Sequence, residues 1–167
     1  MPTSPLRATA SPLVRLTTWH RLGERQVDAL RGLGRQPDPG VADAVLRYFD
    51  LTQSVHHRDE EDDLLPALVD SMAGSDAVCL HELAAAAAAA HRAIEAAWHA
   101  LRPDVLALSQ GAPAVLRDAL VDALAERCRE SFELEDREII PMAARLLDDT
   151  TLAGLAHRFD ARRAARA

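Results

Sequence analysis

The sequence contains no lysine: all 19 of its basic side chains are arginine. The absence of lysine excludes Schiff-base chemistry, a lysine general base and the phosphate-binding lysine of P-loop enzymes. Only two cysteines are present, Cys79 and Cys128. Two thiols are too few for a disulfide framework, a cysteine-rich zinc site or an iron–sulfur cluster. Such sparse cysteine usage fits a reducing compartment, and we predict a cytoplasmic protein.

The sequence also lacks an excess of positive charge and any long apolar run. Its 19 basic side chains face 26 acidic ones, which gives a formal net charge of −7. Proteins that bind nucleic acid or an anionic membrane surface need an excess of basic residues, so we expect neither partner. No window reaches the roughly 18 to 20 apolar residues that a membrane span requires, and residues 1–11 contain no signal-peptide core.

Glycine is scarce, with 7 residues in 167, and alanine is the commonest residue. This composition favours helices, because alanine has the highest helix propensity. Proline, glycine and capping residues delimit four long segments and a short one: Pro12 to about Arg35, about Val41 to Ser71, about Ala77 to Gln110, about Ala114 to Leu147, and Thr151 to Arg163. Long helices with short connections predict an all-α fold, an antiparallel up-down four-helix bundle with a short C-terminal helix.

The length of the chain suits one domain. We predict a disordered N-terminus over residues 1–11, the bundle domain over residues 12–163 and a frayed C-terminus over residues 164–167. Three prolines fall inside the predicted helical segments, and each is expected to mark a kink or the start of a final turn. They are Pro66, Pro103 and Pro141.

Several titratable side chains fall on the apolar faces of their helices when successive residues are placed 100° apart. His56 and Glu60 point inward on the second segment, and Glu135 lies at the centre of the inward arc of the fourth. His20 and His91 occupy the inward faces of the first and third. A buried, ionised glutamate without a partner costs several kcal/mol, and a cation between the helices would remove that penalty.

Histidine and glutamate recur one helical turn apart, in the pairs His20/Glu24, His56/Glu60 and His91/Glu95. Each pair places an imidazole and a carboxylate on one helix face, where they can bind one or two metal ions. Imidazole and carboxylate without thiolate favour iron, with manganese and zinc as alternatives. The sequence therefore predicts a metal site formed by His20, His56, Glu60, His91 and Glu135.

The remaining polar residues near these positions receive less specific predictions. His57 and Glu61 are interpreted as solvated residues or as partners that orient metal-binding imidazoles. The acidic run Asp59–Asp63 is expected to be mostly an exposed face. Surface positions are expected for His81, His99 and His157.

An internal near-repeat connects the second and fourth segments. Residues 56–66 read HHRDEEDDLLP and residues 131–141 read SFELEDREIIP, so that acidic residues, an apolar pair and proline recur at the same offsets. The first stretch is similar to the second-helix signature of the hemerythrin-like family, the HHE cation-binding domain. Residues 135–143, EDREIIPMA, are similar to its fourth-helix signature, and the resemblance covers about Pro12–Leu147.

The resemblance implies a left-handed four-helix bundle around a non-haem di-iron centre. In that family the corresponding residues serve as imidazole ligands on three helices and as two bridging carboxylates. Carried over to this chain, the imidazole ligands are His20, His56 and His91, and the bridges are Glu60 and Glu135.

One position departs from the family pattern. The fourth-helix histidine of the family falls on Ser131, whose hydroxyl is a far poorer ligand than imidazole. Glu95 occupies the place of a second third-helix histidine, so either Glu95 substitutes as a ligand or a water fills an open coordination position.

The predicted function is that of a hemerythrin-like iron protein that binds or reacts with a small oxidant such as dioxygen, peroxide or nitric oxide. The alternative is a bundle with a degenerate or mononuclear metal site that acts as a regulatory or interaction domain, which Ser131 favours. A ferritin-like di-iron protein is a weaker alternative. That fold uses Glu-x-x-His pairs, and no histidine here has an acidic residue three positions before it.

Overall fold

The computed structural model describes residues 11–72 and 75–165, and every regular element in these ranges is helical. The predicted all-α class is therefore confirmed for the described residues. Apart from Ser11, the predicted N-terminal tail lies outside the described residues, as do residues 166–167 of the predicted C-terminal end. Within the described ranges, no helix is long and apolar enough to cross a membrane.

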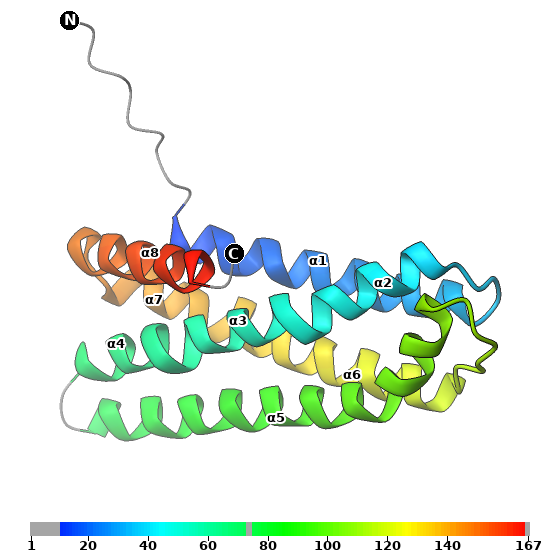
Figure 1. Ribbon diagram of the computed structural model, residues 1–167. Helices are drawn as coiled ribbons and strands as arrows, with labels where there is room; N and C mark the ends of the chain where they lie inside the picture. Colours follow the sequence, from blue (N-terminus) through cyan, green and yellow to red (C-terminus); the bar gives the residue numbers. More distant parts are fainter. Residues whose placement is uncertain (1–10, 73–74, 166–167) are drawn as a thin grey trace, which may run out of the picture.

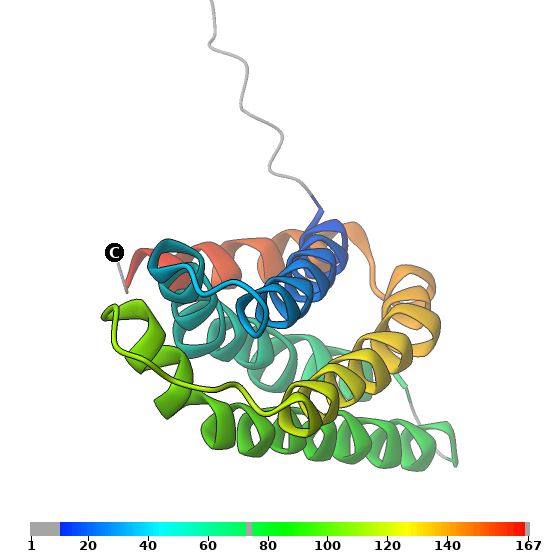
Figure 2. The same ribbon diagram turned by 90° about the vertical axis from the view of Figure 1, so that its right-hand side faces the viewer.

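The helical elements follow one another in four long stretches and a final helix. In chain order they are α1 (Pro12–Leu33), α2 (Pro39–Arg47), η1 (Tyr48–Gln53), α3 (Ser54–Arg58), η2 (Asp59–Leu64), α4 (Leu65–Asp70), α5 (Ser75–Ser109), α6 (Asp118–Leu134), η3 (Glu135–Ile139), α7 (Ile140–Leu146) and α8 (Asp149–Ala164). The three η elements are π-helical turns that interrupt otherwise continuous α-helix. Figure 1 shows the stretches α1, α2–α4, α5 and α6–α7 side by side along one long axis, and Figure 2 shows them from one end.

Aspartate caps explain two helix starts that differ from the prediction. The Asp38 side chain accepts a hydrogen bond from the Val41 N–H at 2.9 Å, and the Asp148 side chain accepts one from the Thr151 N–H at 2.8 Å. Because each cap satisfies an N–H that the first turn leaves free, α2 begins at Pro39 and α8 at Asp149. Both starts lie two residues before the predicted ones.

The fourth stretch begins later than predicted, at Asp118 instead of about residue 114. Residues 112–117 form a non-helical connection after Gly111, whose φ of +72° ends the preceding helix. Leu116 in this connection is buried in the core. The connection thus places an apolar side chain in the core without forming a helix. The prediction of a helix from about residue 114 is wrong for residues 114–117.

The three internal prolines behave as predicted. Pro66 and Pro141 stand in the first turns of α4 and α7, directly after π-helical turns. Pro103 lies inside α5, and the last part of α5, lime green in Figure 1, bends away from the axis of the rest of that helix. Proline lacks the N–H of the i→i−4 bond and its ring clashes with the preceding turn, which accounts for the bend.

The apolar core consists of two clusters that share the four stretches. One contains Val27, Phe49, Ile94 and Phe132, and the other contains Leu16, Leu64, Ala87 and Ile139, among others. On each stretch, a short interval of sequence separates the members of one cluster from those of the other. The predicted metal-site residues fall in these intervals.

Helix α8 packs against α1 and η2. These contacts bury part of the acidic run Asp59–Asp63, which was expected to be mostly exposed. The arginines of α8 pair with Asp59 and Asp63, which are 0% and 7% exposed. The expectation of an exposed acidic run is therefore wrong for these two residues. It holds for Glu61 and Asp62, while Glu60 points inward as predicted.

Gly23 in α1 is required by close packing. A Cβ added there would lie 2.5 Å from the Tyr48 hydroxyl and 2.8 Å from Cζ of Phe132. We predict that Gly23→Ala destabilises the protein by about 1–3 kcal/mol, as overpacking does. Gly32→Ala, in the same helix, is the matched control: nothing lies within 4 Å of its Cβ. The control should be neutral or gain up to about 1 kcal/mol. Equal unfolding free energies for the two variants in urea would contradict this account of Gly23.

Candidate metal centre

The five predicted ligands lie in one buried polar layer between the two apolar clusters. His20 comes from α1, His56 from α3, Glu60 from η2, His91 from α5 and Glu135 from η3. Each is 1% exposed. The helical periodicity of the sequence thus correctly placed all five side chains in the interior.

Both glutamates stand on π-helical turns of similar construction. The Glu60 carbonyl accepts its bond from the N–H of Leu65, and the Glu135 carbonyl from that of Ile140, five residues on in each case. The next residue, Pro66 or Pro141, lacks the N–H that would form a regular i→i−4 bond. Wide turns of this kind are frequent at functional sites. The 100° periodicity did not reveal the π-helical turns, although the repeated proline six residues after each glutamate was a signal for them.

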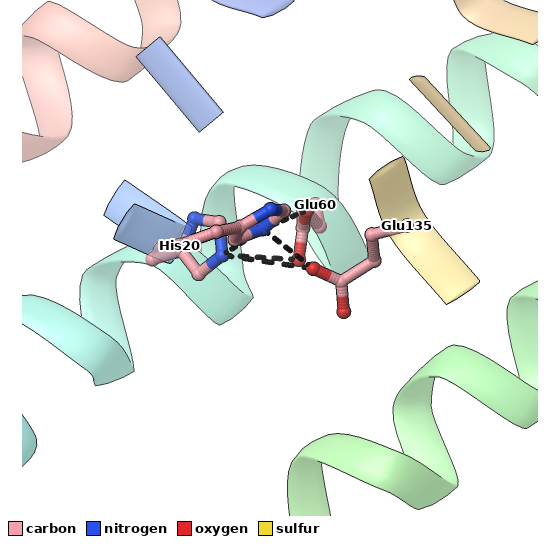
Figure 3. Close-up of side chains that lie close together, drawn as sticks. His20, Glu60 and Glu135 are labelled. Atoms are coloured by element: carbon pink, nitrogen blue, oxygen red, sulfur yellow. Dashed lines mark hydrogen bonds and ion pairs between the residues drawn. The ribbon is translucent and has the colours of Figure 1, made fainter. Parts of the chain in front are cut away.

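The imidazole of His20 faces the carboxylates of Glu60 and Glu135 (Figure 3). The Nε2 atom of His20 lies 2.7 Å from Oε2 of Glu135, 3.0 Å from Nε2 of His56 and 4.0 Å from Oε1 of Glu60. His56 Nε2 lies 3.7 Å from Oε2 of Glu60 and 3.8 Å from Oε2 of Glu135. One ligand atom from each of these four residues lies within 4.8 Å of all the others. The four residues therefore form a compact donor set from three stretches of the chain.

His91 approaches the same carboxylates from a different helix. Its Nε2 atom lies 3.0 Å from Oε1 of Glu135 and 3.1 Å from Oε2 of Glu60. Glu135 thus directs Oε2 toward His20 and Oε1 toward His91. A carboxylate with one oxygen on each side is suited to bridging two positions.

Carboxylates fix two of the imidazoles from behind. His20 Nδ1 donates a hydrogen bond to Oδ1 of Asp136 at 2.8 Å, and His91 Nδ1 donates one to Oε1 of Glu61 at 2.6 Å. Such bonds select the tautomer and direct Nε2 toward the centre. The role of Glu61 as an orienting partner agrees with the prediction, whereas Asp136 was not singled out.

Ser131 faces the centre but supports a carboxylate in the structure. Its hydroxyl, which is fully buried, donates a hydrogen bond to Oε1 of Glu135 at 2.7 Å. Glu95 points elsewhere: its side chain is 52% exposed and its Oε1 lies 3.5 Å from Nδ1 of His57. Glu24, the partner in the first His/Glu pair, is exposed. The structure therefore brings Ser131, and neither of these two glutamates, to the layer.

His57 is buried, so a solvated position is wrong for it. Its ring stacks on His91 with centroids 3.9 Å apart, and its Nε2 accepts a hydrogen bond from Nε2 of Gln53 at 2.8 Å. His20 is covered in a similar way by the ring of Phe132, at 4.7 Å. The imidazoles are thus held by stacking as well as by hydrogen bonds. His81, His99 and His157 are exposed, as predicted.

When no metal ion is bound, protonated imidazoles compensate the negative charge in the buried layer. Burial by itself lowers the pKa of His20, but hydrogen bonds to Asp136 and Glu135 outweigh burial and raise this pKa to about 10. Burial likewise opposes protonation of His91, but hydrogen bonds to Glu135 and two further glutamates raise its pKa to about 12. Two cations therefore stand beside the two inward glutamates near neutral pH.

The pKa values of Glu135 and His57, beside these imidazoles, are lowered. Burial raises the pKa of Glu135, but the surrounding imidazoles outweigh burial and hold this pKa well below its ordinary value. Burial and the charges of His91 and His56 lower the pKa of His57 to about 2. Glu135 is thus ionised and His57 neutral.

The donor set fits a cation of the kind that imidazole and carboxylate prefer. Both oxygens of Glu60, Oε2 of Glu135 and Nδ1 of His56 are buried and take part in no hydrogen bond of good geometry with the described residues. Buried polar atoms without such bonds are costly. A metal ion would engage the carboxylate oxygens and replace the protons on the imidazoles, and iron, manganese and zinc all accept these donors.

Comparison with protein families identifies a match. The family model described as the hemerythrin HHE cation binding domain matches residues 11–143. No curated protein and no solved structure gives a significant match. The matched region contains all five residues of the buried layer and ends before α8.

Protein kept in a chelator should lose stability as the pH rises. Stabilisation by protonated His20 and His91 is complete below their unfolded pKa of about 6.5. It is lost as the pH rises toward the folded values of about 10 and about 12. The unfolding free energy in urea should therefore fall by at most ~1.4 kcal/mol per pH unit and histidine between about pH 7 and pH 9. His20→Gln should reduce this slope and His99→Gln should not. A free energy that stays constant over this range would contradict the charge balance.

Proposed function

Since the chain belongs to the hemerythrin HHE cation-binding domain family, we propose that its buried layer holds non-haem iron. The proposed function is to bind or react with a small oxidant such as dioxygen, peroxide or nitric oxide. The observation that carries the proposal is the convergence of His20, His56 and His91, through their Nε2 atoms, on two buried carboxylates. Three of the four carboxylate oxygens take part in no hydrogen bond of good geometry with the described residues. Packing alone does not require such a layer, because apolar side chains would fill the same space without a desolvation penalty.

The proposed framework is an antiparallel up-down four-helix bundle made of α1, α2–α4, α5 and α6–α7. It is supported by the contacts of α5 with α2 and α6, and of α1 with α2 and α6. It also agrees with the side-by-side course of the four stretches (Figure 2). Bundle interiors are common places for metal sites, because facing helices supply ligands at one depth.

The two proposed iron positions are unequally supplied with ligands. The first would be held by His20, His56, Glu60 and Glu135, whose ligand atoms lie within 4.8 Å of one another. The second would be held by His91 with the oxygens of the same two carboxylates. With fewer protein donors, the second position would bind iron more weakly and leave coordination open to a small ligand.

Iron, when bound, would supply the electrons and the open coordination that binding or reduction of a small oxidant requires. The residues of the chain perform the remaining tasks. Asp136 and Glu61 orient the imidazoles, and Ser131 holds one oxygen of Glu135. The two apolar clusters on either side of the layer exclude water from it, which strengthens every electrostatic interaction inside.

A mononuclear site in a regulatory or interaction domain is the second candidate. It is favoured by Ser131, whose hydroxyl donates its hydrogen bond to Glu135, and by the orientation of Glu95 toward His57. In this case only the four-residue set would retain iron. Metal content distinguishes the two candidates.

Protein purified from iron-supplemented culture should contain iron, and Glu60→Gln should lose most of it. The substitution keeps the shape of the side chain but removes a charge that both positions require. His99→Ala is the matched control, because His99 lies exposed on α5. Iron is measured by elemental analysis, and the absorption spectrum is followed on adding dioxygen, peroxide or nitric oxide. Iron content without any spectral change on adding these ligands would contradict the proposed function.

Ser131→His should increase the iron retained at the second position. An imidazole at this buried site, one turn before Glu135, would add a strong donor beside His91. We expect a rise in iron per chain, measured after dialysis against a weak chelator, with Ser131→Ala as the control that removes the hydroxyl without adding a ligand. An unchanged iron content in a folded Ser131→His variant would indicate that position 131 does not supply the second site.

A further inference from the structure

Helix α8 lies outside the part of the chain that matches the family model, yet its arginines reach the turn that carries Glu60. Asp59, which directly precedes Glu60, is completely buried. Its Oδ1 lies 2.5 Å from Nη1 of Arg162, and its Oδ2 lies 2.6 Å from Nη2 of Arg163. Both oxygens of this buried carboxylate are thus held by α8.

The other end of the same π-helical turn is held as well. Asp63 Oδ2 lies 2.6 Å from Nη2 of Arg162, and Asp63 Oδ1 lies 2.6 Å from Nε of Arg158. Arg162 therefore spans η2 from Asp59 to Asp63. A single π-helical turn depends on its surroundings, because regular α-helix is the more stable local alternative.

Arg163 also connects this turn to the first helix. Its guanidinium carbon lies 5.3 Å from the ring centroid of Trp19, a cation–π distance. Trp19 directly precedes His20, and its carbonyl accepts a hydrogen bond from the Tyr48 hydroxyl at 3.2 Å. One arginine side chain thus contacts the residue before Glu60 and the residue before His20.

We propose that α8 is a clamp that positions the metal ligands Glu60 and His20 through Asp59 and Trp19. The clamp rests on the proposed function, because it acts on the iron site of that proposal. Arg162 and Arg163 are positioning residues that contact no ligand side chain themselves. They compensate the buried charge of Asp59, and this compensation fixes the rotation of η2 and with it the direction of the Glu60 carboxylate. Without the two arginines, the buried Asp59 carboxylate would be unpaired, and its movement toward solvent would distort the turn.

The test compares two single substitutions in α8 of the full-length protein. Arg163→Gln removes one contact to Asp59, the contact to Trp19 and the hydrogen bond from Nη1 of Arg163 to the Phe159 carbonyl. Arg162 keeps a cation on Asp59 so that the variant can fold. Asp160→Asn is the matched control, because it removes an α8 ion pair, to Arg15 at 2.8 Å, that does not involve η2. The affinity for ferrous iron is measured anaerobically by competition with a chelator, well below the melting temperature of each variant.

We expect Arg163→Gln to weaken iron binding by roughly 10- to 100-fold, the range observed when groups that support metal ligands are removed. Arg163→Lys, which keeps the charge, should recover part of the loss, and Asp160→Asn should bind iron like the wild type. The ferric absorption spectrum should also change in Arg163→Gln, because ligand geometry, and not only stability, is affected.

The two proposals fail in different ways. Wild-type protein that binds no ferrous iron would overturn the proposed function. Tight binding by the wild type with equal affinity and an equal spectrum in Arg163→Gln would overturn the clamp alone. Equal losses in Arg163→Gln and Asp160→Asn would also overturn it, because they would reduce α8 to a general stabilising element. If Arg163→Gln does not fold, the comparison of Arg163→Lys with Asp160→Asn decides by the same criteria.

Discussion

The structure depends on the burial of two glutamate side chains in the middle of an apolar helical bundle. Glu60 and Glu135 are each 1% exposed, and their buried carboxyl groups need polar partners that the surrounding apolar side chains do not provide. Imidazoles from three helices, a serine hydroxyl and two π-helical turns are arranged around this requirement. The two apolar clusters lie on either side of the layer and leave room for it on every stretch. A cation at the same place would satisfy the requirement more completely than protons do, because it would engage the oxygens that take part in no hydrogen bond of good geometry with the described residues.

The polar layer has two unequal halves. On one side, His20 and His56 face the carboxylates with their Nε2 atoms 3.0 Å apart. On the other side, His91 stands with a stacked neutral His57 and without a further imidazole directed at the carboxylates. Such asymmetry provides a physical basis for one strongly held ion and a second position with open coordination. The helix beyond the matched region contributes to the first half, through its contacts beside Glu60 and His20.

Much of this architecture could be predicted from helical periodicity and punctuation. The inward positions of His20, His56, Glu60, His91 and Glu135 follow from a repeat of 100° per residue, because all five share faces with large apolar side chains. Three features could not be predicted in this way. The two π-helical turns that carry Glu60 and Glu135 arise where Pro66 and Pro141 remove an N–H, and a regular 100° periodicity does not reveal them. The burial of Asp59 and Asp63 depends on arginines about a hundred positions later in the sequence. The start of α6 at Asp118 follows a non-helical connection in which Leu116 packs into the core.

The central claim is that the buried layer of histidine and glutamate holds iron. Anomalous X-ray diffraction at the iron absorption edge, from crystals of protein loaded with ferrous iron, locates the metal directly. The account predicts a strong peak among His20, His56, Glu60 and Glu135, with a weaker peak beside His91 if the second position is filled. The absence of an anomalous peak in this layer, or iron bound only at surface carboxylates, would contradict it.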